Sequence, residues 1–60
     1  MMPVYYIQFY SRKTGALSKK TGYRTLRDAE ADLKKNHFAD AGGMVWDRAD
    51  YIARIREEKP

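Results

Sequence analysis

The sequence contains no cysteine, so disulfides and thiolate metal sites are excluded as sources of stability. No apolar run approaches the roughly 20 residues that span a bilayer. The first residues also lack the order of a basic segment followed by an apolar one that is typical of a secretory signal. We therefore expect a cytoplasmic protein with no membrane partner.

Histidine is almost as scarce, since His37 is the only one, and it falls on the apolar side of an expected helix. Packing is a more common role there than catalysis. The serines have no histidine placed to activate them, and the Gly-Lys-Ser/Thr order of a phosphate loop is missing. Asp47 and Asp50 offer fewer oxygen ligands than a hard cation requires. We predict no enzyme activity, no cofactor and no metal site.

The short length leaves room for one domain, which we assign to residues 1–60 with 57–60 as a frayed tail. A chain of 60 residues buries only about 60% of its unfolded surface. Its stability must therefore come from one thin apolar layer or from a partner subunit.

Acidic residues are absent from the first 27 positions, which contain six lysines and arginines. Residues 28–60 contain six basic and eight acidic residues, so the net charge of +4 conceals a basic part and a mildly acidic part. A positive field concentrated on one element attracts polyanions. The alternative is a solvated hairpin with an ordinary excess of lysine.

The pattern Ser-basic-Lys-Thr-Gly occurs twice in the basic part, at residues 11–15 and 18–22. Basic side chains, hydroxyls and backbone amides near glycine are groups that bind phosphate oxygens. This stretch favours nucleic acid as a partner. The main phosphate contacts are predicted at Arg12, Lys13, Lys19, Lys20 and Arg24.

The β-branched and aromatic residues 4–10 follow Pro3, which predicts an edge strand. A three-residue turn at 13–15, with Gly15 left-handed, would lead into a second strand in which Tyr23 faces Tyr5. In this register one face carries Tyr5, Ile7, Phe9, Leu17 and Tyr23. The other face carries Tyr6, Gln8, Tyr10, Arg12, Lys20 and Arg24.

Lys19 fits this register badly, because it would point toward the core opposite Phe9. We expect either that its side chain reaches out at the sheet margin or that the second strand bulges, with 21–22 as the expected place.

Thr25 to Asp28 has the form of a capping box and predicts the start of a helix. One apolar stripe follows at helical spacing, formed by Leu26, Ala29, Leu33 and His37. Both signs of charge mix on the outer face, so the helix is expected to support the sheet rather than to read a groove. It is predicted to end between Asn36 and Ala41.

Residues 44–46 and 51–56 predict a second hairpin with a four-residue loop, in which Trp46 faces Tyr51 and Met44 faces Ala53. One side would hold Met44, Trp46, Tyr51, Ala53 and Ile55. The other side would hold Val45, Ile52, Arg54 and Arg56.

Together these elements predict an α+β fold, a small two-layer ββαββ domain with one helix packed on an antiparallel sheet and the other sheet face open. Tyrosine rings on that face would stack on bases, and arginines would contact phosphates. The predicted nucleic-acid-binding residues are Tyr6, Gln8, Tyr10, Arg12, Lys13, Lys19, Lys20, Arg24, Arg54 and Arg56.

We therefore predict a small non-catalytic protein that binds DNA or RNA. The alternative is a small inhibitor or adaptor, of the kind a virus, phage or mobile element encodes, that docks on an acidic host protein. A homodimer that covers the open face with a second copy is a third reading. For Tyr6 and Tyr10 there is also a purely structural explanation, since exposed tyrosine pairs often stiffen hairpins.

Overall fold

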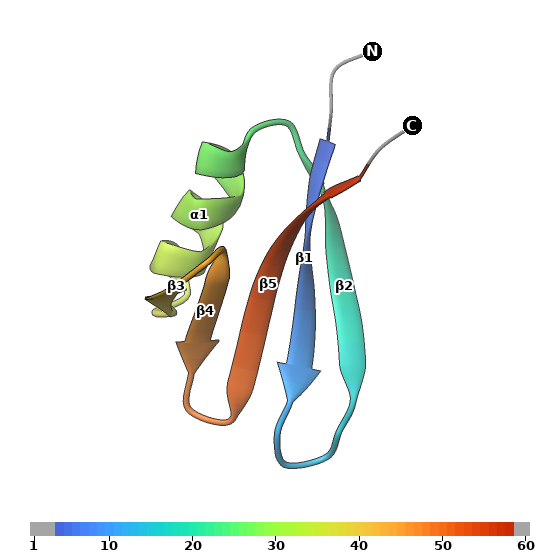
Figure 1. Cartoon of the computed structure of the whole chain (residues 1–60), viewed down its shortest axis with the longest axis vertical. Helices are drawn as coiled ribbons and strands as arrows, with labels where there is room; N and C mark the ends of the chain where they lie inside the picture. The colour runs from blue at the N-terminus through green and yellow to red at the C-terminus, as the bar shows by residue number, and fades with distance from the viewer. Residues whose placement is uncertain (1–3, 59–60) are drawn as a thin grey trace.

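The computed structural model describes residues 4–58, which form an antiparallel sheet with a helix over one face (Figure 1). The sheet has the strand order β2-β1-β5-β4-β3. The elements are β1 (Val4–Ser11), β2 (Leu17–Tyr23), α1 (Leu26–Lys35), β3 (Ala39–Gly42), β4 (Val45–Arg48) and β5 (Tyr51–Glu58). The predicted α+β class and its two layers are confirmed, and β3 is an added short strand that the sequence pattern did not predict.

The two longest strands, β1 and β5, pair along their whole length at the centre of the sheet. The prediction that the first strand lies at an edge is therefore wrong, and Pro3, on which it rested, lies outside the described residues. Glu57 and Glu58, expected in a frayed tail, pair with the start of β1. The rest of that expected tail, 59–60, is also outside the described residues.

The first hairpin contains a β-bulge that shifts its register by one residue. Tyr5 pairs with Tyr23 as predicted, whereas Ile7 pairs with Lys20, one position short of its predicted partner. The two residues between Lys20 and Tyr23 oppose a single residue of β1, at the place where an irregularity was expected. Gly22 has a φ of 95° there, a conformation that glycine adopts without strain.

The connection between β1 and β2 spans residues 12–16, so it is longer than the predicted three-residue turn. Gly15 has the predicted positive φ, at 75°. Because a shift of one residue exchanges the faces of a strand, Leu17 and Lys19 lie on the open face and Lys20 on the helix side. The predicted placement of Leu17 in the core is therefore wrong, and its side chain is 66% exposed.

The second hairpin differs from its prediction by two residues. Trp46 pairs with Ala53 and Arg48 with Tyr51, so the turn consists of residues 49–50 instead of the predicted four-residue loop. Side chains alternate with a period of two along a strand, so this shift leaves the paired residues on their predicted faces.

Strand β3 forms an edge beside β4, with Asp40 opposite Trp46. Its Ala-Asp-Ala-Gly sequence has little β propensity and all four residues are exposed, so backbone pairing rather than side-chain burial defines it. Met44, predicted to face Ala53, instead has a φ of 63° and belongs to the turn between β3 and β4.

Thr25 caps α1 as predicted, because its Oγ1 accepts a hydrogen bond from the Asp28 amide at 3.1 Å. The helix ends at Lys35, a residue before the predicted range. His37 lies past this end, with a φ of 66° and an exposed side chain, so its predicted place on the apolar stripe is wrong. Within residues 4–58, no helix has the length and hydrophobicity needed to cross a membrane.

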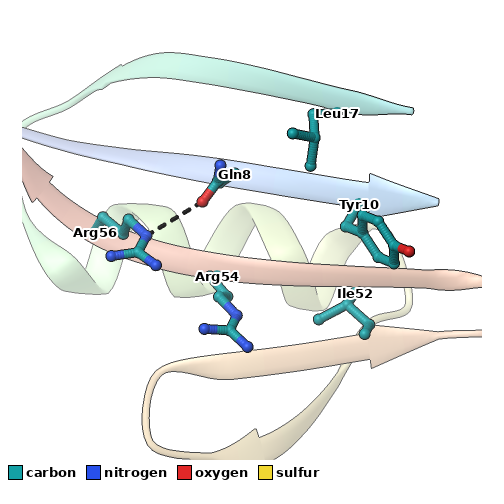
Figure 2. Close-up of a pocket in the computed structure, with 6 residues that line it drawn as sticks. All are labelled: Gln8, Tyr10, Leu17, Ile52, Arg54 and Arg56. Carbon is teal, nitrogen blue, oxygen red and sulfur yellow. Dashed lines mark hydrogen bonds between the residues drawn. The ribbon is translucent and has the colours of Figure 1, made fainter. Parts of the chain in front are cut away.

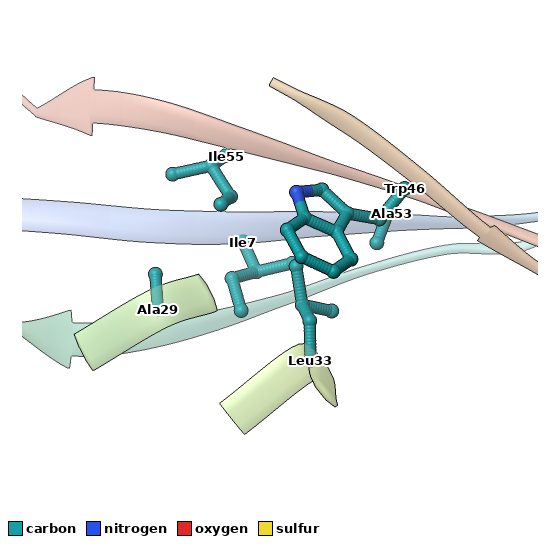
Figure 3. Close-up of a cluster of buried hydrophobic side chains, with 6 residues drawn as sticks. All are labelled: Ile7, Ala29, Leu33, Trp46, Ala53 and Ile55. Atoms are coloured by element: carbon teal, nitrogen blue, oxygen red, sulfur yellow. The ribbon is translucent and has the colours of Figure 1, made fainter. Parts of the chain in front are cut away.

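The core lies between α1 and the sheet, and Figure 3 shows that its side chains come from both layers. Its buried apolar members are Ile7, Ala29, Leu33, Trp46, Ala53 and Ile55. Phe38, the residue after His37, packs against this cluster and lies 5.8 Å from Phe9 between ring centroids. All of this burial is on one side of the sheet, so the other side is left open.

Candidate nucleic-acid interface

The open face of the sheet consists of the residues that alternate with the buried ones on the two central strands. On β1 these are Tyr6, Gln8 and Tyr10, and they pair with Arg56, Arg54 and Ile52 of β5, respectively. The flanking strand β2 adds Lys19 beside Gln8 and Leu17 beside Tyr10. Side chains therefore form rows that run across the strands, with an apolar row next to a row of nitrogen-bearing groups.

A groove of about 330 Å³ crosses this face, lined by Gln8, Tyr10, Leu17, Ile52, Arg54 and Arg56. Figure 2 shows these side chains on the side of the sheet away from α1. One end of the groove is apolar, because Tyr10 lies between Leu17 and Ile52. Tyr10 is 40% exposed, so part of its ring is accessible to a ligand.

The other end of the groove is polar and positively charged. Arg54 and Arg56 are exposed on β5, and Arg56 Nε donates a hydrogen bond to Gln8 Oε1 at 3.2 Å (Figure 2). This bond ties a long, flexible side chain to the half-buried glutamine. Arg54 is opposite Gln8 in the register, but no hydrogen bond of its side chain is found in residues 4–58.

Tyr6 lies beyond this polar end and is partly covered. Lys19 Nζ is 4.6 Å from the centroid of the Tyr6 ring, in a cation–π contact. Such a contact contributes about 0.5–1 kcal/mol at an exposed site, whereas a base stacked on an aromatic ring contributes about 1–3 kcal/mol. A base could therefore displace the Lys19 ammonium from the ring and leave it free to contact a phosphate.

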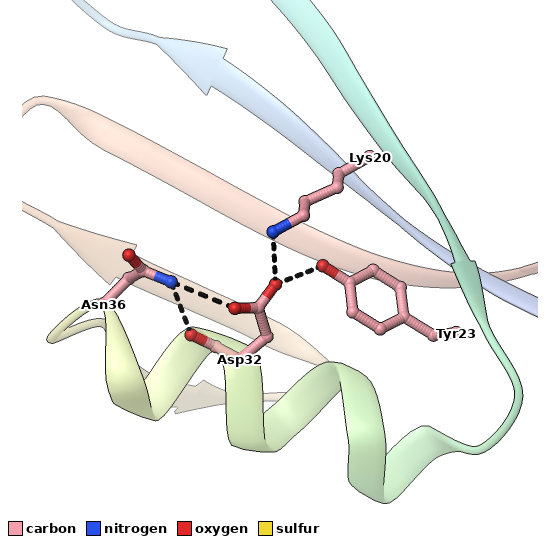
Figure 4. Close-up of polar contacts among 4 residues, drawn as sticks. All are labelled: Lys20, Tyr23, Asp32 and Asn36. Carbon is pink, nitrogen blue, oxygen red and sulfur yellow. Dashed lines mark hydrogen bonds and ion pairs between the residues drawn. The ribbon is translucent and has the colours of Figure 1, made fainter.

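Lys20, predicted on the open face, is on the opposite side of the sheet. Its Nζ forms an ion pair with Asp32 Oδ2 of α1 at 2.8 Å, and Tyr23 donates a hydrogen bond to the same oxygen (Figure 4). Asn36 donates to Asp32 Oδ1 at 3.1 Å. The bulge in β2 brings Lys20 and Tyr23 together on this side, so the prediction of Lys20 as an open-face residue is wrong.

The hydrogen bonds and burial within this cluster shift the pKa values of Asp32, Lys20 and Tyr23. The hydrogen bond from Lys20, followed by that from Tyr23, lowers the pKa of Asp32 below its ordinary 3.8. The same contact with Asp32 raises the pKa of Lys20. The pKa of Tyr23 is raised chiefly by burial and then by its hydrogen bond to Asp32. The contacts therefore hold β2 against the helix.

Three other predicted residues lie outside the groove. Arg12 follows β1, and its guanidinium donates to the Ala49 carbonyl at 3.1 Å, which connects the two hairpin loops. Lys13 is exposed in the same loop. Arg24 is exposed between β2 and α1, at the other end of the hairpin. Figure 1 shows these two regions at opposite ends of the sheet, so the basic residues do not form one patch.

Two groove residues, Leu17 and Ile52, were not among the predicted contacts. Leu17 was assigned to the core in the unbulged register, and Ile52 was placed on the open side but not counted as a contact. The poor fit of Lys19 in the unbulged register was the available signal for Leu17, because a bulge after Lys20 exchanges the faces of both residues.

Comparison with protein-family profiles, with curated proteins and with solved structures finds no match to this chain. The class of the protein is therefore defined by its fold, a five-stranded antiparallel sheet with one helix on one face. Its function has to be argued from the open face.

Proposed function

We propose that this protein binds single-stranded nucleic acid, DNA or RNA, on the open face of its sheet, without catalysis, in the cytoplasm. The observation that carries the proposal is the groove in which the accessible Tyr10 ring adjoins Arg54 and Arg56. Aromatic rings on a sheet provide stacking platforms, and neighbouring cations contact the phosphates.

The spacing of the two tyrosines favours a single strand over a duplex. Tyr6 and Tyr10 are four residues apart on one strand, which corresponds to about 13 Å at roughly 3.3 Å per residue. Bases in a duplex are stacked on one another, so their faces are not available to two rings on a sheet. An unstacked single strand can place separate bases on the two rings.

Charge also supports this partner. Lys19, Arg54 and Arg56 project from neighbouring strands of the open face. Two acidic residues share this face without lining the groove: Asp47 is opposite Ile52 at the apolar end, and Glu58 is at the end of β5. The groove itself therefore offers positive charge to a phosphate backbone.

The test is fluorescence anisotropy with a labelled single strand and a labelled duplex over a range of salt concentrations. The open-face variant would carry Lys19→Gln, Arg54→Gln and Arg56→Gln. Because affinity for single strands falls with salt by a slope of about 0.7 per phosphate contact, this variant should lower the slope by about 2.

The matched control removes three positive charges from the helix instead, with Arg27→Gln, Lys34→Gln and Lys35→Gln. These residues are exposed on α1, on the other layer from the groove. We expect this variant to keep the slope of the original protein. Equal losses in both variants would mean that net charge alone drives binding, and the absence of binding at low salt would reject the proposal.

A protein partner is the second candidate, and the exposure of Leu17 and Tyr10 beside the half-buried Ile52 favours it. Apolar and aromatic residues beside arginine are also the composition of interface hot spots. An acidic protein that this chain inhibits, or a second copy of the chain, would fit this surface. Stoichiometric capture of one protein that survives nuclease treatment, without oligonucleotide binding by the purified chain, would favour this candidate.

A further inference from the structure

We propose that Arg56, oriented by Gln8, makes the open face prefer guanine over adenine in a single strand. This inference rests on the proposed nucleic-acid function and adds base preference to it. The observations that carry it are the hydrogen bond between the two side chains and the chemistry of the groups that surround them.

The bond uses one specific pair of atoms. Arg56 Nε donates to Gln8 Oε1 at 3.2 Å, so the outer Nη1 and Nη2 atoms of the guanidinium remain as a two-pronged donor. In residues 4–58, neither Nη atom has another hydrogen-bond partner. Figure 2 shows the Arg56 guanidinium next to Gln8 on the open face, where a ligand in the groove would meet it.

The residues that flank Gln8 beside this fork are donors, and the acidic Glu58 lies on the far side of Arg56 at the end of β5. Gln8 contributes its amide NH₂, while its oxygen is engaged by Arg56. Arg54 and Lys19 flank Gln8 on the two neighbouring strands and carry only donors. A base edge with two adjacent acceptors therefore fits better here than an edge that presents a donor.

Guanine meets this requirement with O6 and N7, which arginine contacts in a bidentate manner. Adenine presents N7 beside the N6 amino group, which is itself a donor and would face the guanidinium. Tyr10, two residues from Gln8 on β1, gives the same or an adjacent base a ring on which to stack.

Gln8 acts as a positioning residue in this arrangement. Free arginine side chains lose rotamer freedom on binding, and a guanidinium already tied at Nε has less to lose when its outer prongs engage a base. Gln8 is half-buried on a central strand, so its position is fixed and it can hold the Arg56 guanidinium in place.

The experiment compares oligothymidylates that differ in one central base, which is guanine, adenine or 7-deazaguanine. A single guanine prevents quadruplex formation, and 7-deazaguanine keeps the ring and charge but lacks the N7 acceptor. We expect guanine to bind about tenfold more tightly than adenine, and 7-deazaguanine to lose most of that advantage.

Three variants locate the effect. Arg56→Lys keeps the charge but loses the fork, so it should bring the affinities for the guanine and adenine oligomers to the same value. Arg54→Lys makes the same substitution on the neighbouring arginine, which has no bond to Gln8, and should keep the preference. Gln8→Met should reduce the preference without changing the salt dependence.

Equal affinity for the guanine and adenine oligomers would overturn this inference while leaving nucleic-acid binding intact. A preference that survives Arg56→Lys would also overturn it. If none of the oligomers binds, the proposed function fails and the inference fails with it, so the two failures are distinguishable.

Discussion

The two faces of the sheet differ in what their side chains do for the protein. On the helix side, Ile7, Ala53 and Ile55 are buried against α1 and supply the stability. On the open side, Tyr10 and Leu17 remain exposed, although Tyr10 is on the same strand as the buried Ile7. Residues of similar chemistry therefore have opposite roles, and strand alternation decides which role each one has.

The contrast is sharpest in the lysine pair of β2. Lys19 lies over the Tyr6 ring on the open face, whereas Lys20 pairs with Asp32 on the helix side. Adjacent residues with the same side chain thus separate into a candidate ligand contact and a structural contact.

Leu33→Ala should be the most destabilising change. Leu33 is 1% exposed in the core, and truncation of a buried leucine costs about 2–5 kcal/mol. Leu17→Ala, the same substitution on the open face, should change the free energy of unfolding by less than about 0.5 kcal/mol. Urea unfolding followed by the fluorescence of the buried Trp46 measures both, and similar losses would contradict the division between faces.

Gly22→Ala should destabilise the first hairpin. The φ of 95° at Gly22 is unfavourable for a residue with a Cβ, and no atom lies within 4 Å of the added carbon, so the cost is conformational. We expect about 1–2 kcal/mol in urea unfolding. Thr21→Ala at the neighbouring position is the control and should have a smaller effect. An unchanged midpoint for Gly22→Ala would argue against the bulge.

Asp32 should make stability depend on pH at the acid end. Its pKa in the folded state is lowered, so the unfolded chain binds the proton more readily. The contribution is present above the ordinary value of 3.8 and is lost as the pH falls through the lowered value. Thermal unfolding of Asp32→Asn should therefore show a flatter acid limb.

Lys20 and Tyr23, the partners of Asp32, should make stability depend on pH at the alkaline end. The pKa values of Lys20 and Tyr23 are raised from 10.5 and 10.0, so their contributions are complete below those values and are lost as the pH rises above them. Asp50→Asn is the control, because Asp50 makes no ion pair within residues 4–58, and it should keep both limbs. Identical pH profiles for the two variants would reject this role of Asp32.

Lys19→Gln and Lys20→Gln compare the open face with the helix side at two adjacent residues. Loss of Lys19 should lower the salt slope for a single strand by about 0.7, the value for one phosphate contact, and lower the free energy of unfolding by no more than about 1 kcal/mol, the value of its contact with Tyr6. Loss of Lys20 should leave the slope unchanged and weaken the alkaline limb of stability. Anisotropy titrations and thermal unfolding measure both effects in each variant. Reversed outcomes would contradict the placement of Lys19 on the open face and Lys20 on the helix side.

The edges of the sheet add a physical reason for the placement of these lysines. β2 is an outer strand, and an outer strand with unpaired backbone groups invites pairing with another chain. Lysines and a bulge discourage such pairing. The other edge, β3, has only four residues, which also limits a template for pairing.

Patterns of short range were predicted well. The helix cap at Thr25, the buried Ala29 and Leu33, and the positive φ of Gly15 each follow from a few neighbouring residues. His37 was misplaced because a helical stripe was extended by one turn past the actual end at Lys35, and helix ends are set by capping and tertiary contacts as much as by periodicity.

The candidate site was predicted in part, and the errors in β2 have one cause. Tyr6, Gln8, Tyr10, Arg54 and Arg56 are on the open face as expected, because β1 and β5 contain no irregularity in their pairing. In β2 the bulge and the longer loop place Lys20 on the helix side of the sheet and place Lys19 and Leu17 on the open face. In the second hairpin an error of two residues had no such consequence for the faces.

Three properties could be derived from the amino-acid sequence alone: the α+β class, the helix with its cap, and the alternation that separates apolar from polar side chains on the central strands. These properties depend on local propensity and on the period of the backbone. The strand order, the short strand β3, and the faces of Leu17, Lys19 and Lys20 could be assigned only from the folded chain. The reason is that register and strand neighbours depend on contacts between distant segments, and one extra residue in a strand reverses the direction of every side chain before it.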